Sequence, residues 1–168
     1  MGNQIEINQL NKVFNSPGMD RQGEENSLKV LSDVSLSVSK NEFVSLLGPS
    51  GCGKSTLLKL IAGLDRAYDG TVTLEGRDPK QERVPVCYML QKDCLMPWRS
   101  VLSNILLPVE IRRGDLKKAQ KDIGPLLPEF GLDGFESYKP NQLSGGMRQR
   151  AALLRTYLMK GNIMLLDE

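Results

Sequence analysis

The residues from position 48 to 56 have the types and spacing needed to hold the phosphates of a nucleotide. Glycines let successive backbone N–H groups approach phosphate oxygens, and a helix that begins after them adds partial positive charge. We expect Lys54 to reach the β- and γ-phosphates, Ser55 to hold Mg²⁺ and Thr56 to touch the α-phosphate. The predicted phosphate loop consists of Gly48, Pro49, Ser50, Gly51, Cys52, Gly53, Lys54, Ser55 and Thr56.

Two adjacent carboxylates, Asp167 and Glu168, end an apolar run that begins at Ile163. A buried strand delivers its C-terminal residues to the edge at which open α/β sheets bind ligands. We expect Asp167 to hold Mg²⁺ through water, and Glu168 to polarise the attacking water as a general base. Taken alone, a strand that ends in Asp-Glu is more often a solvated strand end, but the phosphate loop upstream favours the catalytic interpretation.

A second set of backbone amides is predicted at Ser144, Gly145 and Gly146. Ser144 can cap a helix, and the two glycines expose the first N–H groups of that helix to an anion. Within a single chain these amides have no obvious phosphate of their own. The alternative interpretation of this pattern is an ordinary capped surface helix.

Three further side chains allow a functional and a structural interpretation. The uncharged amide of Gln91 can touch Mg²⁺ or the attacking water, or it is a solvated loop glutamine. Trp98, the only tryptophan, either docks a partner or packs against helical residues. Phe14, after the first predicted strand, either stacks on an adenine or belongs to the core.

The elements that position these residues can be predicted from the hydrophobic pattern. Strands are predicted at 4–8, 30–38, 42–47, 71–75, 84–89 and 162–166; the segment 42–47 is apolar enough to be covered on both faces, and 162–166 is predicted to be a buried strand. Helices are predicted at 54–64, 101–111, 116–130 and 146–160, and a loop at 15–27. This order predicts a single α/β domain over 1–168, with a β-rich, phosphate-loop part at 1–90, a helical subdomain at 91–160 and a final strand at 161–168.

The composition narrows the function classes. Apolar residues make up 40 % and charged residues 25 % of the 168 residues, which is typical of a soluble globular domain. A net charge of +2 is too small to indicate nucleic-acid binding. No apolar run is long enough to span a membrane, and the three cysteines favour a reducing compartment. The chain has no histidine, so the chemistry must depend on carboxylates, lysine, glutamine, hydroxyls and a metal ion.

Together these motifs resemble those of the ATP-binding subunit of ABC transporters. The segment 48–55 is similar to the Walker A motif, Gln91 to the Q-loop glutamine, 143–150 to the signature motif and 163–168 to the Walker B motif. Met-Pro-Trp-Arg-Ser-Val after Gln91, and Gly-Gly-Met-Arg-Gln-Arg in the signature, are similar to the bacterial import subgroup for nitrate, sulfonate and taurine.

The resemblance implies a RecA-like P-loop NTPase core with a mainly parallel sheet, an N-terminal antiparallel β part and a helical insertion. It implies an ATPase that uses ATP and Mg²⁺ in a head-to-tail dimer, in which the 144–146 amides of one subunit close on the γ-phosphate held by Lys54 of the other. A membrane-embedded permease would dock near Gln91 and Trp98, on the cytoplasmic face of the membrane. A solute-binding protein would act indirectly, and nucleic acid would not be a partner.

The chain departs from the family pattern at its C-terminal end. Family members continue past Walker B to a switch histidine, whereas this chain ends at Glu168 and contains no histidine. We therefore expect a C-terminally truncated core, either a fragment of a longer reading frame or a product of poor stability. Two alternatives stay open: a remnant that binds ATP without hydrolysing it, and a soluble ABC-type ATPase of DNA repair or translation.

Overall fold

The structure is a computed structural model that describes residues 3–19 and 25–167. The chain divides into two compact units, Met1–Val84 and Pro85–Glu168. The predicted phosphate loop lies in the first unit, and the predicted signature and Walker B segments lie in the second. Each unit is described below by itself.

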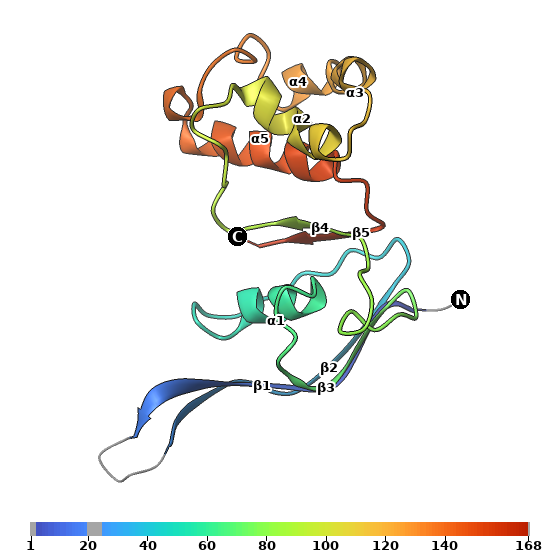
Figure 1. Ribbon diagram of the computed structural model, residues 1–168, viewed down its shortest axis with the longest axis vertical. Helices are drawn as coiled ribbons and strands as arrows, with labels where there is room; N and C mark the ends of the chain where they lie inside the picture. Colours follow the sequence, from blue (N-terminus) through green and yellow to red (C-terminus); the bar gives the residue numbers. More distant parts are fainter. Residues whose placement is uncertain (1–2, 20–24, 168) are drawn as a thin grey trace. The chain divides into compact units, whose positions relative to one another are not determined.

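The first unit is built on an antiparallel sheet of three strands. β1 (Asn3–Met19) lies between β2 (Glu25–Ser39) and β3 (Asp69–Leu74). The helix α1 (Lys54–Ile61) covers one face of this sheet (Figure 1). Alternating apolar residues of the strands face one side, so the sheet and the apolar face of α1 can share a core. The buried residues of this unit include Ile5, Ile7, Leu10, Leu31, Leu57, Leu60, Ile61, Val72 and Leu74.

The strands predicted at 4–8, 30–38 and 71–75 are confirmed, but the loop predicted at 15–27 is wrong where the structure describes it. β1 continues to Met19 and β2 begins at Glu25, with Asn15 opposite Ser27 and Met19 opposite Glu25. Backbone ladder bonds need no apolar side chains, so a polar sequence can extend a hairpin that is already paired at its base. Residues 20–24 of the predicted loop lie outside the described residues.

The strand predicted at 42–47 is also wrong. Residues 42–49 have no regular structure, and Phe43 is 87 % exposed and Leu47 93 % exposed. The apolar sequence has the composition of a strand, but a strand forms only when neighbouring backbone accepts and donates its hydrogen bonds. Among the residues that the structure describes, none of the strands pairs with this segment.

The second unit contains a pair of parallel strands and a set of helices. β4 (Val86–Met89) and β5 (Ile163–Leu166) pair in register, with Tyr88 opposite Leu165. The helices are α2 (Val101–Ile111), α3 (Leu116–Ile123), α4 (Leu126–Glu129) and α5 (Gly145–Tyr157), with a 3₁₀ turn at Pro140–Gln142. In Figure 1, α5 runs alongside the two strands and α2 packs on α5.

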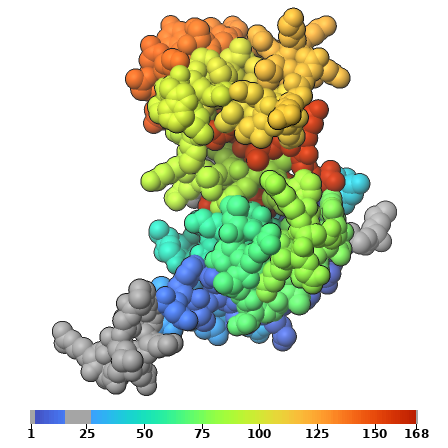
Figure 2. Space-filling model, in the orientation of Figure 1, coloured from blue at the N-terminus to red at the C-terminus, as the bar shows by residue number. Residues whose placement is uncertain are grey.

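The helices of the second unit enclose one apolar cluster. Its fully buried members include Val101, Ile105, Ile123, Leu132, Ala151 and Leu154. The side chains of α2 and α3 form a continuous surface in the space-filling view (Figure 2). The helix predicted at 101–111 is confirmed, whereas the one predicted at 116–130 divides into α3 and α4. Pro125 lies at the break. Proline lacks the backbone N–H that would continue α3, so the helix ends before it.

The final strand, predicted to be buried, is buried on one face only. Ile163 and Leu165 are buried, whereas Met164 is 42 % and Leu166 44 % exposed. Parallel pairing with β4 nevertheless confirms an α/β core with parallel strands. None of the helices in the described part of the chain is long and apolar enough to cross a membrane.

Candidate functional site

The predicted phosphate loop leads directly into α1. Gly53 occupies the N-cap position with φ 98°, a left-handed conformation that glycine adopts without strain. A Cβ at this position would lie 2.8 Å from a methyl carbon of Leu31, so the space is closed to other residues as well. The glycine therefore allows the chain to turn into α1 immediately after the loop, which places the helix N-terminus at the loop.

Lys54 folds its side chain back over the loop. Its ammonium donates hydrogen bonds to the carbonyl oxygens of Gly48 and Pro49, both at 2.8 Å, and lies 3.6 Å from Cys52 Sγ. The loop therefore carries a full positive charge beside the partial positive charge of the α1 N-terminus. Such a pair of charges suits a polyanion such as a triphosphate.

The rest of the loop is accessible to a ligand. Pro49, Ser50, Gly51 and Cys52 are exposed, while Ser55 and Thr56 on the first turn of α1 are partly buried. The hydroxyls of Ser55 and Thr56 are the side-chain oxygens that this turn offers to a metal ion or a phosphate. The structure thus brings together, within the first unit, the predicted phosphate ligands from Gly48 to Thr56.

Phe14 lies on β1 opposite Leu28 and is 43 % exposed. This exposure does not fit the core-packing interpretation, and it leaves part of the ring open for contact with a ligand. The ammonium of Lys12 lies 4.7 Å from the centre of the ring. No motif in the sequence marks Lys12 as a functional residue, so the sequence alone did not predict this contact.

The start of α5 carries the second predicted set of amides. Ser144 is the N-cap, and its hydroxyl accepts a hydrogen bond from the N–H of Met147 at 3.3 Å. Gly145 and Gly146 follow in the first turn and are exposed. The predicted cap is confirmed, and the first N–H groups of a 13-residue helix face accessible space.

A cavity of about 660 Å³ lies between this helix start and the segment that follows β4. Gln91, which is exposed, lines the same cavity as Gly145 and Gly146. The full lining is Gln91, Lys92, Asp93, Cys94, Gly145, Gly146, Arg148 and Gln149. Gln91 is therefore not an isolated loop glutamine, because it shares a polar cavity with the predicted anion-binding amides.

Two arginines of α5 contact Asp93 and Cys94, which line this cavity. The sequence patterns did not identify either arginine. Arg148 Nε lies 3.1 Å from the Asp93 carboxylate, and its Nη1 donates to the Leu143 carbonyl oxygen at 2.9 Å. Arg155 donates to the backbone oxygens of Asp93 (2.5 Å) and Cys94 (2.8 Å). Burial lowers the pKa of Arg155, and the nearby Cys94 and Asp93 oppose that shift. The two arginines are seven residues apart, which places them on one helix face, and this spacing is the signal that could have identified them.

Asp167 lies at the end of β5 and is 5 % exposed. Its Oδ2 accepts a hydrogen bond from the hydroxyl of Tyr88 at 3.0 Å, and its backbone N–H donates to the Met89 carbonyl oxygen. The parallel register of β4 and β5 explains this contact, since it brings the ends of the two strands together. Glu168 lies outside the described residues.

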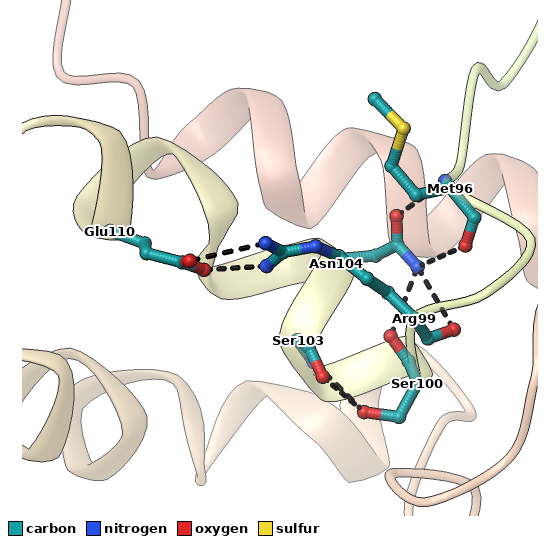
Figure 3. A network of polar contacts seen from close by, with 6 residues as sticks. All are labelled: Met96, Arg99, Ser100, Ser103, Asn104 and Glu110. Atoms are coloured by element: carbon teal, nitrogen blue, oxygen red, sulfur yellow. Dashed lines mark hydrogen bonds and ion pairs between the residues drawn. The ribbon is translucent and has the colours of Figure 1, made fainter.

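The segment that carries Trp98 is clamped from within by Asn104. The Asn104 side chain is fully buried; it accepts from the Met96 N–H at 2.7 Å and donates to the carbonyl oxygens of Met96 (3.1 Å) and Ser100 (3.0 Å) (Figure 3). Arg99, which precedes α2, pairs with Glu110 of α2 at 2.5 Å (Figure 3). Trp98 itself is 69 % exposed, so it does not pack into the helical core.

The described residues contain no group of three or more cysteine, aspartate, glutamate or histidine side chains that could hold a metal ion. A magnesium ion that accompanies a nucleotide would therefore need ligands other than such a group of side chains. Hydroxyl, amide and carboxylate oxygens, together with water and phosphate, are the ligands that Mg²⁺ prefers. Within the first unit Ser55 offers a hydroxyl oxygen, and within the second unit Gln91 and Asp167 offer an amide and a carboxylate oxygen.

Comparison with known proteins identifies the family of this chain. The sequence model of the ABC transporter family matches residues 31–168, which include the phosphate loop, Gln91 and the capped start of α5. The chain belongs to the ABC transporter family.

Relatives in this family are similar over most of the chain. The uncharacterized ABC transporter ATP-binding protein YtlC of Bacillus subtilis is 48 % identical over 81 % of the chain and 52 % of its own length. The aliphatic sulfonates import ATP-binding protein SsuB of Bacillus subtilis is 42 % identical over 88 % of the chain and 56 % of its own length. The chain thus spans about half the length of these curated relatives.

A solved ABC cassette also shares the fold. The ATP-binding cassette MJ0796, in a dimeric post-hydrolysis structure bound to ADP and Pi, superposes with a TM-score of 0.81 at 28 % identity. The match covers 98 % of this chain and 73 % of the cassette. The predicted P-loop NTPase fold class is confirmed.

Proposed function

We propose that this protein is the ATP-binding and ATP-hydrolysing subunit of an ABC transporter that imports a small anion such as nitrate, a sulfonate or taurine. The observation that carries the proposal is the phosphate loop. There, the Lys54 ammonium and the N-terminus of α1 concentrate positive charge beside exposed backbone. The family match supports the same function.

Each residue of the nucleotide site has a proposed role. The loop from Gly48 to Lys54 binds the β- and γ-phosphates, Thr56 binds the α-phosphate, and Phe14 stacks on the adenine. Ser55, Gln91 and Asp167 hold Mg²⁺, directly or through water, since their oxygens are ligands that this ion accepts. When bound, Mg²⁺ neutralises charge on the phosphate oxygens during phosphoryl transfer.

Hydrolysis requires a base, an oriented water and stabilisation of the charge that develops. We assign the base to Glu168, which takes a proton from water as the water oxygen attacks the γ-phosphorus. The bond to the β–γ bridging oxygen breaks, and ADP leaves with that oxygen. Gln91 orients the water, and Lys54 stabilises the negative charge on the transferred phosphoryl group.

We further propose that two copies of the protein form a head-to-tail dimer. The exposed amides of Gly145 and Gly146, with the Ser144 cap, then bind the γ-phosphate held by the partner copy. The dimeric structure of the related cassette supports this arrangement.

A membrane-embedded permease is the proposed second partner. The exposed Trp98, near Gln91 in sequence, offers an aromatic anchor for a segment of the permease. The protein would then work on the cytoplasmic face of the membrane, and a solute-binding protein would deliver solute to the permease. The sulfonate import relative supports a small anion as the solute.

Substitution of Lys54 tests the nucleotide site. Lys54→Ala removes a charge-assisted hydrogen-bond donor from the phosphates, so ATP affinity should fall about 10- to 100-fold. Isothermal titration calorimetry measures the change. Lys59→Ala, at an exposed lysine of the same helix, is the matched control and should bind ATP normally. Equal affinity of the Lys54 variant and the unaltered protein would contradict the assignment.

Turnover and co-purification separate the proposal from its two alternatives. ATP binding without release of phosphate by the whole protein that the gene encodes would favour a binding-only remnant. Co-purification with nucleic acid would favour a soluble ATPase of DNA repair or translation. Co-purification with a membrane protein encoded in a neighbouring reading frame supports the transporter subunit.

A further inference from the structure

The side chain of Lys12 is buried in the first unit, although lysine is normally exposed. It is 4 % exposed and lies on β1 two residues before Phe14. Among the residues that the structure describes, its ammonium contacts the Asp65 carboxylate at 2.7 Å, the Ala67 carbonyl oxygen at 2.6 Å and the Phe14 ring, whose centre is 4.7 Å away. A buried ammonium needs such neighbours, because an unpaired charge is costly to remove from water.

The two polar partners of Lys12 come from the segment that follows α1. Asp65 and Ala67 lie a few residues after the end of that helix, and the Ala67 N–H donates to Asp65 Oδ1 at 2.9 Å. The hydrogen bond from Lys12 lowers the pKa of the Asp65 carboxyl, with burial opposing the shift. The carboxylate is therefore charged at neutral pH and pairs with the ammonium at 2.7 Å.

The contact with Phe14 orients the ring. A cation held against an aromatic face is attracted by the electron density of that face. Because Lys12 is itself anchored by Asp65 and Ala67, the ring rests on a fixed charge. With 43 % of its surface exposed, the ring still offers area to a ligand.

We propose that Lys12 is a positioning residue for the nucleotide base: anchored to Asp65 and Ala67, it holds the Phe14 ring in the orientation that stacks on adenine. This inference rests on the proposed function, since it needs Phe14 to contact the base. A ring that is oriented before binding loses less freedom when the base arrives, and this raises affinity without a new contact to the ligand. The lysine also links the base-binding strand to the segment after the phosphate-loop helix.

The test compares ATP with tripolyphosphate, which has the phosphates but no base. Both affinities are measured by calorimetry on the whole protein as its gene encodes it. In Lys12→Met, which keeps the length and removes the charge, we expect ATP affinity to fall about 5- to 10-fold and tripolyphosphate affinity to stay unchanged. Lys12→Arg should retain most of the ATP affinity. Asp65→Asn, which leaves Lys12 in place, should weaken ATP binding in the same base-dependent way.

Lys29→Met, at an exposed lysine of β2, is the matched control and should change neither affinity. Equal losses for ATP and tripolyphosphate in Lys12→Met and Asp65→Asn would overturn the inference, because the lysine would then be merely structural. No loss in either variant would overturn it too.

Phe14→Ala separates a failure of the inference from a failure of the proposed base site. If Phe14→Ala weakens ATP binding and Lys12→Met does not, the base site stands and the role of Lys12 is wrong. If Phe14→Ala leaves the ATP affinity intact, the proposed adenine contact is wrong, and the inference is overturned with it.

Discussion

Asp167 accepts a hydrogen bond from the hydroxyl of Tyr88, and burial, followed by that bond, raises the pKa of the hydroxyl well above its ordinary value. A tyrosine hydroxyl is protonated at neutral pH even at its ordinary pKa, and the upward shift of the Tyr88 pKa extends this donation to the carboxylate toward more alkaline pH. Lys54 is similarly held by the carbonyl oxygens of Gly48 and Pro49. At the scale of single residues, the chain itself fixes the proposed ligands of metal and phosphate before any ligand arrives.

Cys52 allows a chemical test of the phosphate loop. Its thiol is exposed and lies 2.8 Å from the position that a Cβ on Gly48 would occupy, so it sits within the loop. A thiol adduct would fill space that phosphate needs, and we expect alkylation by N-ethylmaleimide to abolish ATP binding. Excess ATP should protect the thiol, as followed by mass spectrometry.

Cys52→Ser is the control for this experiment. The variant retains the exposed Cys94 and the buried Cys87, and it should bind ATP normally after the same treatment. Loss of binding in the treated Cys52→Ser protein would place the sensitive thiol outside the loop.

The residue contacts that the sequence predicted are the local ones. The cap at Ser144 joins two residues three positions apart, and its pattern is visible in the sequence. The pair of Asp93 and Arg148 joins residues 55 positions apart, and no local pattern indicates it. Such contacts depend on how the elements pack, which a single sequence does not reveal to pattern reasoning.

At the scale of elements, the segment before α2 depends on one buried amide. In Asn104→Leu a similar volume remains, but the Met96 N–H and the carbonyl oxygens of Met96 and Ser100 lose their side-chain partner. The two carbonyl oxygens keep the backbone N–H groups of Arg99 and Asn104 as partners, but the Met96 N–H is left unpaired, which should lower the free energy of unfolding by about 1–3 kcal/mol. Urea denaturation measures the loss.

Asn141→Leu provides the matched comparison for that experiment. Asn141 is exposed in the 3₁₀ turn, so its replacement should change the free energy of unfolding by no more than about 0.5 kcal/mol. A similarly small change in Asn104→Leu would show that the clamp contributes little to stability.

The sequence predicts best those helices and strands whose hydrogen bonds and caps lie within their own segment. α2 has a capping serine and an internal apolar face, and its predicted range, 101–111, matches the observed helix. The segment 42–47 has a strand composition but needs a backbone neighbour, and it forms no strand. Helical hydrogen bonds close within one segment, whereas a strand depends on another part of the chain.

At the scale of the whole molecule, the proposed dimer can be trapped. Glu168→Gln keeps the shape of the side chain but removes the proposed base, so bound ATP should persist and hold two copies together. Light scattering after size exclusion should report a dimer with ATP and Mg²⁺, and a monomer without nucleotide. These measurements are made on the whole protein that the gene encodes.

The double variant Lys54→Ala, Glu168→Gln is the control for dimerisation. It lacks the phosphate-binding lysine and should stay monomeric at the same ATP concentration. Turnover of ATP by Glu168→Gln at the unaltered rate would contradict the assignment of the base.

The exposed segment from 42 to 49 bears on the solubility of the molecule. It presents Phe43, Val44 and Leu47 on backbone that has no ladder partner among the described residues. An apolar segment of this kind is a template for pairing with the same segment of another copy, which is the first step of edge-to-edge aggregation. Lys40 lies just before this segment and Glu42 is its first residue. Their charges oppose pairing between copies at this end of the segment. Self-association through this segment should therefore compete with the native state increasingly as the protein concentration rises.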